Sequence, residues 1–341
     1  MNRQEKLAAG IAAGAAVAMA VNRAMRERHR IDFAGRHVLI SGGSRGLGLV
    51  LARQLAAEGA RLSLFARDPA ELARAQQQIR SECPADVIVL RCDVRRHAEV
   101  RAAVDTLLQS WDAIDVLINN AGVIQVGPLE HMTREDFENA MATHFWGPLQ
   151  LMQECIPVMR RRAFGRIVNI SSIGGKIAVP HLAPYCASKF ALTGLSDAVR
   201  SELNQYGIRV TTVNPGLMRT GSPRNANMKG RHESEYAWFA IADALPGLSV
   251  SAESAARQII EACRFGDPDL TISPQARAAI WANAIAPGLV AAGMMLATRF
   301  LPGPTGSEGD RQKRGWESQS RWAPSFVTTL GDHAAVKNNE V

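Results

Sequence analysis

The sequence lacks the cysteine patterns by which small secreted proteins and many zinc proteins are recognised. Its five cysteines, at positions 83, 92, 155, 186 and 263, are odd in number and scattered, and no two of them form a CxxC pair. This excludes a disulfide framework and a cysteine zinc site, and it favours a reducing compartment. No cluster of carboxylates or cysteines accompanies His131 or His181, so we predict no bound metal.

Positive charge is not concentrated enough for a nucleic-acid-binding surface. The formal net charge is +7, yet basic residues are dense only in RAMRERHR, at positions 23–30. A basic cofactor site with scattered surface arginines accounts for this charge, and we predict no nucleic-acid partner. With 341 residues, 47% of them hydrophobic, the chain can form one large domain or two small ones.

Long uninterrupted apolar runs are also lacking. The uncharged run at 7–21 forms at most about 22 Å of helix, short of the roughly 30 Å hydrocarbon core of a bilayer. The basic cluster after it argues against translocation. We therefore assign residues 1–34 to an apolar and basic segment, which is either a surface helix or a membrane-associating one. We expect a cytoplasmic protein, with membrane association through this segment as the alternative.

A second uncharged stretch lies near the C-terminus, at 278–298, and Pro287-Gly288 interrupts it. We predict a broken pair of helices over 276–301, which either covers the domain or lies on a membrane. The tail at 302–341 is polar and rich in Gly, Pro and Ser. This composition predicts a disordered segment.

Between these ends, short β-branched runs alternate with amphipathic helical patterns. Such alternation predicts a parallel sheet covered by helices on both faces. The polar segment at 217–250 has no clear period and is too long for a simple connection, so we predict a lid or substrate loop there. The expected strands are 37–41, 61–66, 86–92, 115–120, 166–171, 209–214 and 269–273, and the expected helices are 47–59, 69–82, 95–111, 134–163, 184–206 and 251–266.

A glycine-rich turn, SGGSRGLG at 41–48, joins the first expected strand to the first helix. Glycines let the backbone turn tightly and approach a phosphate, whose charge the helix N-terminus favours. Glycine is common in strand-to-helix turns, so the turn alone is weak evidence. Its position between a buried strand and an amphipathic helix makes a dinucleotide site a strong prediction.

Tyr185 and Lys189 stand four residues apart, which places them on one face of a helix. With three tyrosines and six lysines in the chain, chance predicts about 0.05 such pairs. A free tyrosine titrates near pH 10, and a nearby ammonium or an oxidised nicotinamide favours its phenolate. We predict Tyr185 as the acid and base of hydride-transfer chemistry, and Lys189 as the residue that lowers its pKa and binds the ribose. The alternative is an ordinary pair on a helix surface.

With these features, residues 35–275 resemble the short-chain dehydrogenase/reductase family. The resemblance is carried by Gly42-x3-Gly46-x-Gly48, the Asn-Asn-Ala-Gly turn at 119–122, Ser172 with Tyr185 and Lys189, and Pro215-Gly216 with Thr220. It implies a Rossmann-type, doubly wound α/β fold with a mainly seven-stranded parallel sheet. It also implies that Ser172 binds the substrate oxygen and that Ser171 is structural. The implied cofactor-binding residues are Gly42, Ser44, Arg45, Gly46, Leu47, Gly48, Arg67, Asp93, Val94, Asn120, Ala121, Gly122, Tyr185, Lys189, Pro215, Gly216 and Thr220.

The sequence departs from the family pattern at His144. The family usually has an asparagine here, followed two residues later by a glycine, and this asparagine helps hold a water near the lysine. Imidazole can also relay protons near neutral pH, so His144 is a catalytic candidate. The alternative is a buried histidine with a structural hydrogen bond.

The charge at the end of the second strand predicts the cofactor. A carboxylate there would bind the 2′-hydroxyl of NAD, but this chain has Ala66 followed by Arg67. Arg45, in the glycine turn, is within reach of the same group, and two guanidiniums favour a 2′-phosphate. By family spacing, Asp68 lies beyond the discriminating position. We therefore predict NADP(H) in preference to NAD(H).

The sequence thus predicts an NADP(H)-dependent oxidoreductase that interconverts a carbonyl and a secondary alcohol. The apolar terminal segments suggest a lipophilic substrate, although they would equally serve packing or anchoring. The alternative function is a catalytically idle NADP(H) sensor or scaffold. By resemblance, we expect a homodimer or homotetramer.

Overall fold

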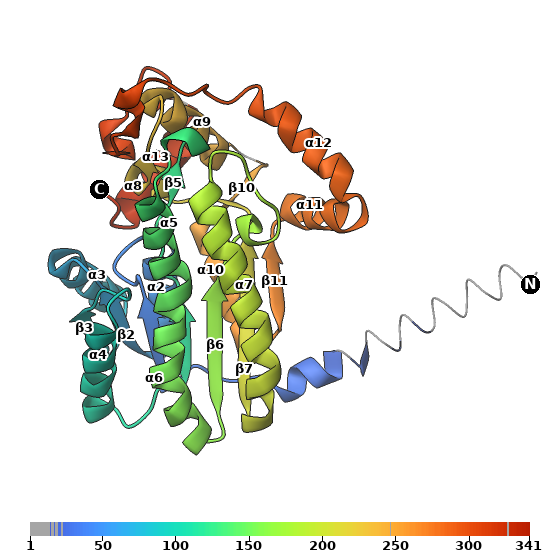
Figure 1. Ribbon diagram of the computed structural model, residues 1–341. Helices are drawn as coiled ribbons and strands as arrows, with labels where there is room; N and C mark the ends of the chain where they lie inside the picture. The colour runs from blue at the N-terminus through green and yellow to red at the C-terminus, as the bar shows by residue number, and fades with distance from the viewer. Residues whose placement is uncertain (1–13, 15–16, 18–19, 22, 246, 326) are drawn as a thin grey trace, which may run out of the picture.

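A seven-stranded, all-parallel sheet forms the centre of the computed structural model, which describes residues 14, 17, 20, 21, 23–245, 247–325 and 327–341 (Figure 1). The strand order reverses between β1 and β4, as in a doubly wound fold, which confirms the predicted fold class. In spatial order the strands are β11 (Asp269–Ile272), β7 (Ile208–Pro215), β6 (Gly165–Ile170), β4 (Val116–Asn119), β1 (His37–Ser41), β2 (Arg61–Ala66) and β3 (Val87–Arg91).

Helices cover both faces of this sheet, because successive residues of each strand point to opposite sides. In β1, Val38 and Ile40 pack into one apolar cluster and Leu39 into the other, and all three are fully buried. The first cluster lies under α2 (Gly46–Ala57), α3 (Pro69–Glu82) and α10 (Ala252–Phe265). The second lies under α4 (His97–Ser110), α6 (Gly147–Arg161) and α7 (Ala183–Leu203).

The segment predicted as a lid or substrate loop has secondary structure of its own. It contains β8 (Leu217–Arg219), α8 (Ser222–Asn225), β9 (Asn227–Met228), α9 (His232–Ala244) and β10 (Ser249–Ser251). Tyr236 and Phe239 of α9 pack into a third apolar cluster. Glu235 and Asp243 lie on the buried side of the same helix, so acidic residues interrupt the apolar pattern that would have predicted it.

The uncharged stretch near the C-terminus folds into two helices, α11 (Pro274–Ile285) and α12 (Pro287–Thr298). They meet at Ala286, because the following proline lacks the backbone N–H that would continue the first helix. In Figure 1 both helices project from one side of the sheet.

The tail at 302–341, expected to be disordered, is instead folded onto the rest of the molecule. It contains η5 (Ser307–Asp310), β12 (Lys313–Arg314), η6 (Gly315–Glu317) and α13 (Thr329–Lys337), and β12 pairs with β9. The polar side chains that suggested disorder bond to the domain, as when His131 Nδ1 contacts Asp310 Oδ1 at 2.8 Å. In Figure 1 this segment, drawn in red, returns from α12 over the carboxyl edge of the sheet.

Most of the apolar run at 7–21 lies outside the described residues. Residues 23–28 are helical, and Arg26 Nε contacts Asp267 Oδ1 at 2.7 Å. In the part of the chain that the structure describes, no helix combines the length and apolarity needed to cross a bilayer.

Candidate active site

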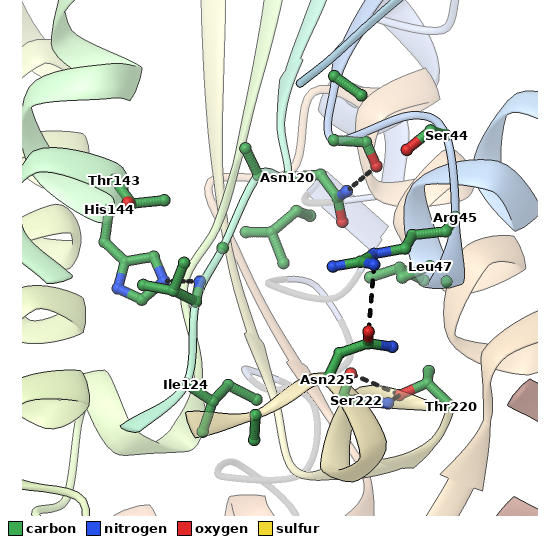
Figure 2. Close-up of a pocket in the computed structure, with 18 of the residues that line it drawn as sticks. Ser44, Arg45, Leu47, Asn120, Ile124, Thr143, His144, Thr220, Ser222 and Asn225 are labelled. Atoms are coloured by element: carbon green, nitrogen blue, oxygen red, sulfur yellow. Dashed lines mark hydrogen bonds between the residues drawn. The ribbon is translucent and has the colours of Figure 1, made fainter. Parts of the chain in front are cut away.

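A cavity of about 690 Å³ opens at the carboxyl edge of the sheet, where the strand order reverses. Every residue predicted to be catalytic or to bind the cofactor lines this cavity, apart from Gly48. Figure 2 shows Ser44, Arg45 and Leu47 on one side of it and Thr143 and His144 on the other. The turns that follow separate strands therefore bring distant parts of the sequence together.

The glycine turn between β1 and α2 has a conformation that side chains would obstruct. Gly42 and Gly46 have φ angles of 66° and 56°, in the left-handed region. A Cβ atom on Gly48 would lie 2.1 Å from the Gly42 carbonyl oxygen, so Gly48 packs behind the turn. This explains why Gly48 does not line the cavity although the motif requires it.

Asn120 fastens the end of β4 to this turn. Its Nδ2 atom donates hydrogen bonds to the carbonyl oxygens of Ser41 and Gly42, at 3.2 and 3.0 Å. The backbone N–H groups of Asn120 and Ala121 donate to the Ser41 hydroxyl, at 3.1 and 3.2 Å. The glycine turn is thereby fixed relative to the neighbouring strand of the sheet.

Tyr185, Lys189 and Ser172 meet at the end of β6. Lys189 Nζ lies 5.6 Å from the centre of the Tyr185 ring, and the Ser172 side chain hydrogen-bonds to the phenol. Ser171 has a different environment, since its hydroxyl donates to the Lys189 carbonyl oxygen at 3.1 Å and contacts Thr193 Oγ1 at 2.8 Å. Both serines line the cavity, and the Ser171 hydroxyl is also engaged by residues of α7, so the separate roles implied for them stay predictions.

Burial has the largest effect on the pKa values of Tyr185 and Lys189. It raises the pKa of Tyr185 to about 12, against the lowering effect of the Ser172 hydrogen bond. It also lowers the pKa of Lys189 to about 7, although Nζ donates to the Ile170 carbonyl oxygen at 2.8 Å. The expected lowering of the tyrosine pKa is therefore not produced by the protein groups alone.

His144 lies in a five-residue π-helical turn, η2 (Ala142–Trp146), just before Pro148, which has no N–H for the His144 carbonyl. Its Nε2 atom accepts a hydrogen bond from the Val123 N–H at 3.1 Å. Nδ1 therefore carries the proton and donates to Ser188 Oγ at 2.7 Å. Burial, followed by the nearby Lys189 charge, holds the His144 pKa well below its usual value.

Both ring nitrogens of His144 are thus engaged and the ring is neutral. This favours the structural interpretation over the proton relay, although the ring lines the cavity and contacts Tyr185 edge to face at 5.5 Å. His144 holds the residues after β4 and the start of α7 in place.

Several arginines lie close together at one part of the cavity. Arg67 lines the cavity, and its pKa is lowered by burial and then by the neighbouring charge of Arg95, with smaller effects from Arg45 and Arg314. Arg45 Nη1 contacts Glu71 Oε1 at 3.0 Å and Asn225 Oδ1 at 3.1 Å, the latter contact being visible in Figure 2.

Acidic groups near these arginines are already engaged. The Asp68 side chain accepts from the N–H groups of Ala70 and Glu71, at 2.7 and 3.1 Å, and so caps α3. Asp93 is held by Arg95, with an Oδ2–Nη2 distance of 2.6 Å. Asp68 also lines the cavity, and its place outside the discriminating position stays a prediction.

Several cavity residues were not predicted from the sequence, namely Glu71, Asn225, Arg314, Trp316 and Glu340. They come from α3, α8 and the C-terminal tail, and no motif marks them. Only the tertiary fold, with the tail returning over the sheet, brings them to the cavity. The described residues contain no group of three His, Cys, Asp or Glu side chains that could hold a metal ion.

Comparisons with known proteins identify the family to which the chain belongs. The family model for short chain dehydrogenases matches residues 36–230. A dehydrogenase/reductase SDR family protein 7-like of Anopheles gambiae is 32% identical over 77% of this chain and 83% of its own. A 3-ketodihydrosphingosine reductase of Bacteroides thetaiotaomicron is 37% identical over 56% of this chain and 67% of its own.

Solved structures give the same result. An actinorhodin polyketide ketoreductase with NADPH has a TM-score of 0.63 and 30% identity, over 70% of this chain and 95% of its own. A Burkholderia phymatum short chain dehydrogenase/reductase in complex with NAD shares the fold, with a TM-score of 0.70 and 24% identity over 81% of this chain and 98% of its own. The chain belongs to the short-chain dehydrogenase/reductase family. It is accordingly an NAD(P)-dependent oxidoreductase that acts on alcohol and carbonyl groups.

Proposed function

We propose that this protein interconverts a carbonyl and a secondary alcohol with NADP(H), using Tyr185 as the proton donor and acceptor. The observation that carries the proposal is the convergence of Tyr185, Ser172 and Lys189 on one cavity with the glycine turn. The turn suits a dinucleotide phosphate, because it joins a strand to a helix N-terminus and its close packing leaves no room for a Cβ at Gly42 or Gly48.

The proposed steps at the substrate follow from the three side chains. When bound, the nicotinamide supplies or accepts the hydride. Ser172 Oγ hydrogen-bonds to the substrate oxygen, and Tyr185 Oη gives this oxygen its proton during reduction or removes it during oxidation. Lys189, whose pKa burial lowers to about 7, is charged in a large share of molecules near neutral pH and then stabilises the phenolate.

The preference for NADP(H) is supported by the arginines at the adenosine end. Arg45 and Arg67 both line the cavity, and the charge of Arg314 acts on Arg67 as well. A 2′-phosphate dianion would pair with Arg67 and give Arg45 a further charged partner, which the 2′-hydroxyl of NAD would not do.

The substrate is proposed to be lipophilic. Ile124, Ala226 and Met218 give part of the cavity an apolar lining. Large apolar side chains of α11 and α12 are also exposed, among them Ile285 at 79% and Leu289 at 76%. We propose that these two helices lie on a membrane surface, from which an apolar substrate would be delivered.

Assembly into a dimer or tetramer through α7 is also proposed, since Phe190 on this helix is 44% exposed. A sedimentation measurement that finds only monomers at micromolar concentration would contradict this assembly.

A turnover assay tests the proposed function. Purified protein is mixed with NADPH and a panel of lipophilic ketones, and loss of NADPH absorbance is followed for the native chain and for Tyr185→Phe. We expect the variant to bind NADPH normally while its turnover falls at least about a hundredfold, because the proton donor is lost. Tyr206, a partly buried tyrosine that does not line the cavity, gives the control, and Tyr206→Phe should leave turnover unchanged. Tight NADPH binding with no turnover on any ketone would favour the idle sensor or scaffold.

A further inference from the structure

The last residues of the chain lie directly on the glycine turn. The Gly46 N–H donates a hydrogen bond to the Asn338 carbonyl oxygen at 2.9 Å. Asn339 Nδ2 donates to the Ser44 carbonyl oxygen at 2.9 Å, and a Glu340 carboxylate oxygen accepts from the Gly221 N–H at 2.5 Å. Glu340 lines the cavity and is only 7% exposed.

Side chains from the domain hold this segment in place. Arg74 Nε donates to Asn339 Oδ1 at 2.8 Å, and Asn225 Nδ2 donates to the Glu340 carbonyl oxygen at 3.2 Å. Just before it, Lys337 Nζ contacts Glu253 Oε1 at 2.5 Å. The C-terminal residues are therefore held by contacts to three helices, α3, α8 and α10.

This position conflicts with a bound dinucleotide. A Cβ built on Gly46 would lie 3.2 Å from the carboxyl carbon of Glu340, so the carboxyl group is packed against the turn. The N-terminus of α2 and the backbone beside Thr220 are where an anionic pyrophosphate would be bound. A carboxyl group and a pyrophosphate cannot share this space, and their negative charges would repel each other.

We propose that residues 338–341 compete with the cofactor's pyrophosphate for the glycine turn, so that the C-terminus must leave before the cofactor binds. The inference rests on the proposed function only for the identity of the ligand, because any pyrophosphate that binds the turn would meet the same obstruction. Burial raises the pKa of Glu340 to about 7, while the Gly221 hydrogen bond and the Arg45 charge lower it. A partly neutral carboxyl group is less costly to bury, which favours the docked C-terminus.

Cofactor affinity gives the first test. NADPH binding is measured by fluorescence for the full chain, for a chain lacking residues 338–341, and for Glu340→Ala, which loses the hydrogen bond to Gly221. Removing the competitor should lower the dissociation constant about tenfold for the shortened chain, and by a smaller factor in the same direction for Glu340→Ala. Val336, which is 70% exposed in α13, gives the control, and Val336→Ala should leave the constant unchanged. Equal constants for all four proteins would overturn the proposal.

Limited trypsin digestion gives a second test that does not depend on the oxidoreductase assignment. The bond after Lys337 is restrained while the C-terminus is docked, since the Lys337 carbonyl oxygen accepts from Gln78 Nε2 at 3.4 Å. NADPH should speed cleavage at this bond in the full chain, and inorganic pyrophosphate alone should do the same. Unchanged or slower cleavage with a ligand that binds would overturn the inference. If no form binds NADPH, the proposed function fails, and cleavage with pyrophosphate still decides the competition.

Discussion

Lys189 carries a charge that is costly for this fold to bury, because burial lowers its pKa to about 7. Only 5% of it is exposed, and its Nζ atom has the Ile170 carbonyl oxygen, 2.8 Å away, as a hydrogen-bond acceptor. Sequence spacing could place Lys189 beside Tyr185, because a helix fixes which residues share a face. It could not give the protonation states, since these depend on burial by residues far away in the chain.

Replacing Lys189 should therefore stabilise the protein while it impairs turnover. The Lys189 pKa is about 7 in the folded protein and near 10.5 for the free side chain. Below pH 7, Lys189 is charged in both the folded and the unfolded protein, so folding carries the full free-energy cost of burying this charge. The cost disappears as the pH rises toward 10.5, because the folded protein then holds the neutral amine. Native stability should rise across this window, and Lys189→Met should not show this rise. We expect the variant to be about 2 kcal/mol more stable at low pH, by urea unfolding.

The control for this prediction is Lys313→Met, which removes a lysine that is only partly buried, at the surface of the tail. Its stability should follow the pH dependence of the native chain. If Lys189→Met gained stability with rising pH as steeply as the native protein does, the buried-charge explanation would be wrong.

Among the helices and strands, sequence patterns predicted the bounds best for strands that are covered on both faces of the sheet. The bounds of β1 and β2 match the predicted runs at 37–41 and 61–66, because strands covered on both faces are continuously apolar. The expected helix at 134–163 is divided into α5 (Arg134–Met141), the π-helical turn and α6. Pro148 has no N–H to donate to the His144 carbonyl oxygen, which accounts for the π-helical turn. The sequence alone did not show that the helix changes its hydrogen bonding at this point. The tail was misjudged because its stabilising contacts are polar and distant.

The helices α11 and α12 expose many large apolar side chains, whereas a helix at a protein surface usually exposes polar ones. All twelve residues of α12 are described, and none of them is buried. Arg277 and Arg299 lie near the two ends of the uncharged stretch. Apolar side chains between basic residues are typical of helices that lie at the interface of an anionic membrane.

A vesicle-binding measurement tests this surface. The double variant Ile285→Lys with Leu289→Lys should bind vesicles of mixed anionic and neutral phospholipid at least about tenfold more weakly, because each buried apolar side chain contributes about 1.5–3 kcal/mol. Leu129→Lys changes a residue that is 65% exposed elsewhere on the molecule and should have no effect. Removal of residues 1–24 measures the N-terminal contribution separately. Equal binding by the double variant and the native chain would remove α11 and α12 from the membrane proposal.

Considering the molecule as a whole, the arginine-lined part of the cavity, where we propose that the adenosine binds, is assembled from segments far apart in the chain. Arg45 comes from the glycine turn, Arg67 follows β2, Arg95 follows β3 and Arg314 comes from the tail. Arg95 forms an ion pair with Asp93, and Arg45 contacts both Glu71 and Asn225. Arg67 is therefore the arginine of this group that is most available to bind a phosphate. Motif spacing could predict Arg45 and Arg67 but not the acidic and tail residues around them.

Cofactor preference should follow from this cluster. In Arg45→Ala with Arg67→Ala, we expect NADPH affinity to fall about a hundredfold, because two charge-assisted hydrogen bonds are worth about 1.5–3 kcal/mol each. NADH has no 2′-phosphate, so its affinity should change less than about threefold. Arg53→Ala is the matched control, since Arg53 lies on α2 but pairs with Glu82 outside the cavity. Titrations of all three proteins with both cofactors decide the matter: equal losses for NADPH and NADH would mean that these arginines support the turn rather than recognise a phosphate.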